Sequence, residues 1–115
     1  KEFVGPLAAL NKEWGDLTMQ IGMRAMQNPD EVGAAAVDYL YFSGYVTLAY
    51  LWARMALVAQ EKLAAGTTDV DFYNAKVTTA RFYFKKILPR VRSHVDVIAG
   101  GLDPLMALDA EHFAF

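Results

Sequence analysis

The middle of this chain holds fifteen consecutive residues without a charge, between Asp38 and Arg54. A membrane span needs about 20 apolar residues, and this stretch also contains four tyrosines, a serine, a threonine and a glycine. We therefore interpret it as a helix buried on nearly every side and expect no membrane span. Because two neighbouring helices cannot surround a third, we expect a second copy of the chain, or another domain of a longer chain, to cover its remaining face.

Aromatic residues of this stretch are the types enriched at protein contacts, because each has an apolar body and a polar tip. They are Tyr39, Tyr41, Tyr45, Tyr50 and Trp52. A homodimer through the Tyr39–Trp52 helix is the contact we expect first. The alternative is a tightly packed core from which the tyrosine hydroxyls reach solvent.

The first helix is predicted over residues 4–27 from an apolar stripe with steps of four and three. The stripe consists of Phe3, Leu7, Leu10, Trp14, Leu17 and Ile21. Gly15 and Gly22 lie on another line, where we expect a second backbone to come close. Met19, Met23 and Met26 form a softer stripe that is suited to filling gaps.

The second helix is predicted over residues 29–65, because Asn28 can cap its first amides and Pro29 suits the first helical position. Gly66 is expected to stop it. The third helix is predicted over residues 70–99, with a kink near Lys85–Leu88 because Pro89 removes one backbone hydrogen bond.

The buried stripe expected on the third helix also steps by four and three, and a tail over residues 102–115 follows. The stripe consists of Tyr73, Val77, Ala80, Phe84, Ile87, Val91, His94 and Ile98. The expected apolar anchors of the tail are Leu105, Met106, Leu108, Phe113 and Phe115. No strand alternation competes, so the expected fold is all-α: an antiparallel up-down-up bundle of three long helices, forming one domain over residues 1–115.

Composition excludes several classes of function. The chain has 115 residues, a formal net charge of −2 and no cysteine, which argues against nucleic-acid binding, disulfides and thiol catalysis. A compact domain of this length has a radius of gyration of roughly 13 Å. The chain begins at Lys1 without a recognisable leader, so we expect a cytoplasmic protein and a piece of a longer chain.

Candidate catalytic residues are few. His94 lies on the apolar stripe, where a packed histidine is the ordinary explanation, and His112 lies in Asp109-Ala110-Glu111-His112, where a metal would lack orienting neighbours. No Glu-x-x-His pair or phosphate-binding glycine loop occurs, and Ser43 lacks triad partners. We therefore assign no catalytic, cofactor-binding or metal-binding residue.

Charge is unevenly distributed along the chain. Residues 72–95 carry six basic groups and no acid, whereas residues 96–115 carry four acids and no base. The basic residues are Lys76, Arg81, Lys85, Lys86, Arg90 and Arg92. This Lys76–Arg92 helix indicates either docking to an acidic partner or, as we favour, a solvated face balanced by Asp38, Glu61 and the acidic tail.

Three stretches, taken together, resemble a known domain. They start at Asp38-Tyr39-Leu40, at Phe72-Tyr73-Asn74 and at Leu105-Met106-Ala107. In this order they are similar to the extra C-terminal domain of bacterial acyl-CoA dehydrogenases, in the branch that includes methylthiopropanoyl-CoA dehydrogenases. The resemblance covers residues 28–115 well and residues 1–27 only in general pattern.

This resemblance implies a parent enzyme that binds FAD and removes two hydrogens from the α and β carbons of an acyl-CoA thioester, as in fatty acid metabolism. The flavin site and the glutamate base belong to the upstream core, so no catalytic residue is carried over, Glu61 included. The fragment is then a non-catalytic accessory domain that packs on that core or on its twin in a homo-oligomer. Two alternatives remain: a stand-alone interaction module that uses the basic helix, and a carrier with a ligand pocket lined by Tyr45, Met55 and Phe84.

Overall fold

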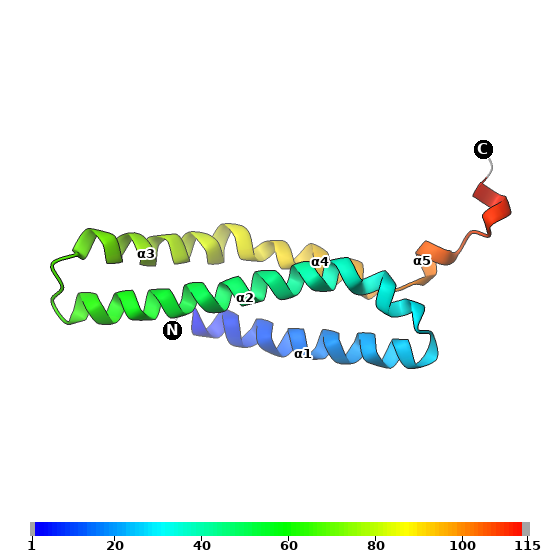
Figure 1. Ribbon diagram of the computed structural model, residues 1–115, viewed down its shortest axis with the longest axis horizontal. Coiled ribbons are helices and arrows are strands. Elements are labelled where there is room, and N and C mark those ends of the chain that lie inside the picture. The colour runs from blue at the N-terminus through cyan, green and yellow to red at the C-terminus, as the bar shows by residue number, and fades with distance from the viewer. Residues whose placement is uncertain (1, 114–115) are drawn as a thin grey trace.

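A computed structural model describes residues 2–113, and every regular element in this range is helical, which confirms the all-α prediction. The elements are α1 (Val4–Gln27), α2 (Asp30–Ala64), α3 (Val70–Phe82), the π-helical turn η1 (Tyr83–Ile87), the 3-10 turn η2 (Leu88–Arg90), α4 (Val91–Gly100), α5 (Asp103–Met106) and the 3-10 turn η3 (Ala110–Phe113). Figure 1 shows α2 running back along α1, and α3 to α4 returning along the other side of α2.

The apolar stripe of α1 faces the other helices as its spacing predicts. Phe3, Leu10 and Leu17 are buried, and Leu7, Trp14 and Ile21 pack half-buried against the core that contains Leu10 and Leu17. The methionine stripe behaves differently, because Met19, Met23 and Met26 are all more than 60% exposed. Among the described residues, these methionines therefore fill no gap between helices.

Both ends of α2 follow local chemistry. The Asn28 side-chain oxygen accepts the backbone N–H of Asp30 at 3.1 Å, which satisfies an amide at the helix start. At the other end Gly66 has φ +84°, a left-handed conformation that favours glycine, and the Thr67 N–H donates to the Lys62 carbonyl at 3.2 Å. The helix therefore ends where the glycine allows the chain to reverse.

The predicted disruption around Pro89 is observed, and it changes which residues are buried. The Leu88 N–H donates to the carbonyl of Tyr83, five residues back, which is the π-helical pattern of η1. Tyr83 and Leu88 are buried, whereas Phe84 and Ile87 are half-buried. The predicted stripe placed Phe84 and Ile87 in the core, but the buried residues are Tyr83, one position earlier, and Leu88, one position later. The reason is that a π turn brings residues five positions apart onto the same face.

The centre of the main core lies on α2. Phe42 and Val46 are the largest fully buried side chains, and they pack with Leu17 of α1 and with Leu88 and Val91 of the third rod, the name we give to the segment from α3 to α4. A smaller cluster of Phe3, Ala56 and Ala80 closes the end where α1 begins. Alanines on α2 let the helices approach closely at this end.

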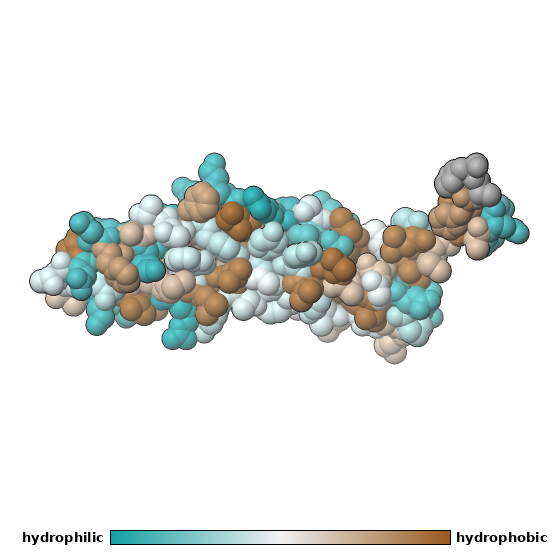
Figure 2. Space-filling view, turned by 45° about the horizontal axis from the view of Figure 1, so that its top comes forward, coloured by the Kyte–Doolittle hydropathy of each residue, from teal (hydrophilic) through white to brown (hydrophobic). Residues whose placement is uncertain are grey.

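The molecule is long and thin. Its extents are 69 × 32 × 15 Å and its radius of gyration is 19.4 Å, well above the roughly 13 Å of a compact chain of this length. The 35 residues of α2 alone span about 52 Å. Such a shape has much surface for its volume, and Figure 2 shows patches of brown, hydrophobic side chains among pale and teal ones on the face in view.

The tail does not anchor on the bundle. Leu102 is buried, but Leu105, Met106, Leu108 and Phe113 are each more than half exposed, and Figure 1 shows the chain projecting away from the helices after α5. The expected anchoring by these four side chains is wrong within this chain. Phe115, the fifth, lies outside the described residues.

One helix among the described residues, α2, is long and apolar enough to cross a membrane. Its most apolar window of 18 residues has a mean hydropathy of 1.2. Core helices of other proteins pass this test too, and α2 supplies Phe42 and Val46 to the core. The absence of a membrane span stays a prediction.

Candidate docking surface

The side of α2 opposite its buried residues Phe42 and Val46 is apolar and exposed. We call this side the outer face of α2, and its members are Val37, Leu40, Tyr41, Gly44, Leu48, Leu51, Met55 and Val58. The large side chains among them are between 37% and 69% exposed. Burying such side chains is favourable by about 25 cal/mol per Å² of apolar area, so the outer face is suited to contact with another protein surface.

The outer face arises because apolar residues occupy two opposite sides of one helix. Phe42, Val46 and Ala49 point into the core, while Leu40, Leu48 and Leu51 lie on the other side of α2. The prediction of a helix buried on nearly every side does not hold within one copy of the chain. The prediction that two neighbouring helices leave a face uncovered does hold.

Four of the five aromatic residues expected at the contact separate into three environments. Tyr41 lies on the outer face, and Tyr50 is exposed on the side of α2 toward Phe3 and Leu7. Tyr45 and Trp52 pack half-buried against the core. The outer face is therefore mainly aliphatic, and its aliphatic spacing was the signal that the sequence analysis did not use.

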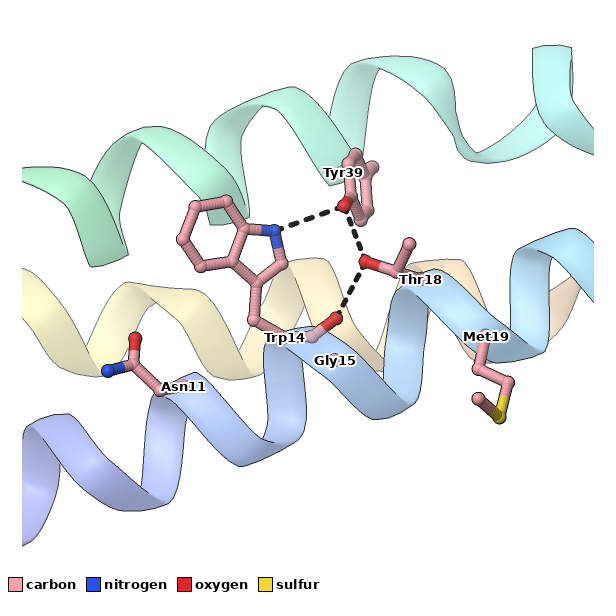
Figure 3. A pocket seen from close by; sticks show the side chains of 6 residues that line it. All are labelled: Asn11, Trp14, Gly15, Thr18, Met19 and Tyr39. Carbon is pink, nitrogen blue, oxygen red and sulfur yellow. Dashed lines mark hydrogen bonds between the residues drawn. The ribbon is translucent and has the colours of Figure 1, made fainter.

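The remaining tyrosine, Tyr39, joins α2 to α1 through a closed ring of hydrogen bonds (Figure 3). The Trp14 indole N–H donates to the Tyr39 hydroxyl at 3.1 Å, and the Thr18 hydroxyl donates to the Trp14 carbonyl at 2.8 Å. Since the Thr18 hydrogen is used, the Tyr39 hydroxyl donates to Thr18. Tyr39 thus has its polar partners within the chain, and it lines an open hollow of about 530 Å³ beside Gly15.

Among residues 2–113, nothing lies directly against Gly15 or Gly22. A Cβ added at either residue would meet nothing within 4 Å. The close approach of a second backbone that these glycines suggested therefore does not occur within this chain.

His94 is a packed residue, as the sequence analysis favoured. Its Nδ1 lies 2.9 Å from an Asp38 carboxylate oxygen, and its ring stacks on Tyr41 at 5.3 Å between centroids. Tyr45 lies at 5.8 Å on the same ring. This contact joins α4 to α2 and uses the last charged residue before the chargeless run.

The basic helix is partly neutralised by α1. Arg81 makes a bidentate contact with Glu2 at 2.8–3.1 Å, and Arg92 pairs in the same way with Glu13. Hydrogen bonding to Arg81 lowers the pKa of the Glu2 carboxyl, and the same bonds raise the pKa of Arg81. The expected balancing acids were Asp38, Glu61 and the tail. Instead, Asp38 binds His94, while Arg81 joins the third rod to Glu2, just before α1, and Arg92 joins it to Glu13 of α1.

Asp109, Glu111 and His112 come within 4.8 Å of one another near the chain end, and all three are exposed. An exposed acidic group with one histidine has no surrounding side chains to orient its ligands, so we assign no metal to it.

The three residues of the alternative ligand pocket, Tyr45, Met55 and Phe84, do not meet. Tyr45 lines a hollow with Leu40, whereas Met55 lines another with Phe72, and Phe84 packs on Phe3 at 5.1 Å.

The described residues thus define an all-α domain with a long apolar face left open and with its histidines in structural or exposed positions. Such a face is suited to contact with another protein surface. The chain belongs to the family described as "Acetyl-CoA dehydrogenase C-terminal like", which it matches over residues 1–109. It is therefore a C-terminal domain of the acyl-CoA dehydrogenase family, as the resemblance implied.

A curated relative agrees with this assignment. The chain is 35% identical over 85 residues, 72% of its own length, to the broad-specificity linear acyl-CoA dehydrogenase FadE5 of Mycobacterium tuberculosis. The matched part is 14% of that protein. The chain therefore corresponds to a small part of this relative.

Proposed function

We propose that this chain is the C-terminal accessory domain of a cytoplasmic, FAD-dependent enzyme that α,β-dehydrogenates acyl-CoA thioesters. The family and the relative named as a broad-specificity linear acyl-CoA dehydrogenase support this assignment. The domain itself is non-catalytic. Its role is to pack, through the outer face of α2, on the enzyme core or on the same domain of a second subunit.

FAD does not fit this domain. The hollows between α1 and α2 are lined mainly by apolar side chains such as Ile21, Val32 and Ala35. Residues 2–113 also lack the glycine-rich turn by which many dinucleotide sites bind phosphates. FAD therefore belongs to the remainder of the enzyme, and no step of the reaction is assigned to a residue of this chain.

The observation that carries the proposal is the exposure of the outer face. Leu40, Leu48 and Leu51 are each about half exposed or more, although they lie in the middle of the longest helix. A domain that works alone has no reason to keep such a surface, whereas a domain joined to a larger enzyme can bury it.

The test begins with the coding sequence upstream of Lys1, which should encode a flavin-binding core. The purified full-length protein should be yellow, and a linear acyl-CoA added without oxygen should bleach its flavin absorbance. Residues 1–115 expressed alone should bind no flavin. A full-length protein without flavin, or one whose flavin no acyl-CoA reduces, would contradict the proposal.

A further inference from the structure

The seam positions along the outer face of α2 have the same spacing whether α2 is followed from its N-terminus or from its C-terminus. We infer that α2 pairs antiparallel with α2 of a second copy, about a twofold axis at the level of Val46. This inference rests on the proposed function only in requiring that the outer face be an interface. It adds the occupant and the register of that interface.

All members of the outer face except Leu40 follow the spacing of a two-helix seam. Ten positions along α2 alternate steps of four and three without interruption. They are Asp30, Ala34, Val37, Tyr41, Gly44, Leu48, Leu51, Met55, Val58 and Lys62. Nine of them are exposed, and Ala34 is half-buried. The seam therefore runs for about 48 Å, nearly the whole length of α2.

The ten positions are symmetric about position 46. In an antiparallel pair centred there, Gly44 faces Leu48 of the second copy, and Ala34 faces Val58. Tyr41 faces Leu51, and Val37 faces Met55. Small residues thus lie opposite large ones in two layers, which gives the complementary shape that a tightly packed seam requires.

Gly44 has room for this contact. A Cβ added to Gly44 would meet nothing within 4 Å, and Leu48, one turn further along the same face, is 48% exposed. In the antiparallel pair each Leu48 side chain packs over the Gly44 backbone of the other copy. The two leucines then lie on either side of the twofold axis.

Charge at the ends of the seam favours the antiparallel direction. Asp30 begins α2 and Lys62 lies in its last turn, so antiparallel pairing puts an acid beside a base at both ends. Parallel pairing in register would put Asp30 beside Asp30 and Lys62 beside Lys62, which is unfavourable. The interior of the seam, from Ala34 to Val58, carries no charge. Charge and shape thus select the same arrangement.

A cross-linking experiment in the full-length enzyme tests the register. Val37 and Met55 are 18 positions apart on α2, about 27 Å, and the inference brings each beside the other residue of the second copy. V37C and M55C chains with different affinity tags are co-expressed and oxidised. We expect disulfide-linked dimers joining the two tags, at least tenfold above the yield from either variant expressed alone.

Two controls define the face and the register. L57C replaces M55C in the matched pair, because Leu57 is 57% exposed but lies on another side of α2, and this pair should not cross-link. The unsubstituted enzyme shows the background from cysteines elsewhere. Efficient cross-linking of V37C to itself would indicate parallel pairing and overturn the inference.

Thiol labelling separates failure of the inference from failure of the proposed function. If no cross-link forms but V37C and M55C react with a maleimide at least tenfold more slowly than V97C, another part of the enzyme covers the face. That result overturns pairing with a second copy and leaves the accessory role intact. If both react as fast as V97C, whose position is 56% exposed in the domain, the face is bare and both proposals fail.

Discussion

Phe42 is one of the two largest fully buried side chains among the described residues, although nothing in its own neighbourhood of the sequence sets it apart from the other aromatic residues. Its side chain is 0% exposed. The Phe42→Ala substitution should lower the free energy of unfolding by about 3–5 kcal/mol, because it removes a buried ring and leaves a cavity. Denaturant titration followed by circular dichroism measures this loss.

Trp52→Ala and Phe84→Ala are compared with Phe42→Ala. If Trp52 and Phe84 are core residues, as the sequence predicts, each substitution should also lower the free energy of unfolding by about 3–5 kcal/mol. Both side chains are half-buried against the core, so we now expect each loss to be smaller than that of Phe42→Ala. A larger loss for either would contradict this ranking. Losses below 1 kcal/mol for both would remove them from the core altogether.

Tyr83 should make the domain less stable at alkaline pH. Its hydroxyl donates to the Tyr45 carbonyl at 2.7 Å, and burial, with a smaller effect of Tyr45, raises the pKa of Tyr83 to about 12. The folded state thus holds the proton more tightly than the unfolded chain, where tyrosine has a pKa of about 10. The stabilisation is complete below pH 10 and is lost as the pH rises through about 12.

The measurement is the free energy of unfolding between pH 9 and 12 for the wild-type protein and for Tyr83→Phe. The wild-type value should fall more steeply above pH 10, since phenylalanine has no proton to lose. Lysines and the other tyrosines titrate in both proteins, so their effect cancels in the difference. Parallel curves would mean that Tyr83 ionises normally.

At the scale of the element, replacing each of two glycines by alanine should change the stability of the domain in opposite directions. One glycine ends α2 and the other lies inside α1. Gly66→Ala should destabilise the domain by about 1–2 kcal/mol, because φ is +84° where α2 ends. Gly15→Ala should stabilise it by about 1 kcal/mol, because Gly15 is inside α1 and an added Cβ meets nothing. Thermal or denaturant melts of the two variants give the signs. A destabilising Gly15→Ala would show that another surface approaches α1 at this point.

The third rod shows how much of a helix can be predicted from the spacing of its apolar residues. Pro89 predicts that the α-helical pattern is disturbed near Lys85–Leu88. It does not predict whether the chain responds with a bend or with a π turn, because that choice depends on which side chains the core accepts. Here the core takes Tyr83 and Leu88, five residues apart, and the π-helical bond from Leu88 to Tyr83 follows that choice.

At the scale of the whole molecule, the tail contributes little to the bundle. Deleting residues 103–115 should shift Tm by less than about 2 °C, because Leu105, Met106 and Leu108 are mostly exposed. Leu102→Ala should cost about 2–4 kcal/mol, since Leu102 is buried. Calorimetry of the two variants tests the boundary. A large loss on deletion would mean that the tail packs on the domain after all.

Apolar spacing and the turn residues Asn28 and Gly66 determined the helices locally, because helix caps and amphipathic stripes act over a few residues. The chargeless run also established that α2 needs more cover than its two neighbours supply. Only the tertiary structure decided which side of α2 stays open, which turn becomes π-helical and that Glu2 and Glu13 meet the basic helix. Those outcomes depend on residues far apart in the chain, whose contacts exist only once the helices pack.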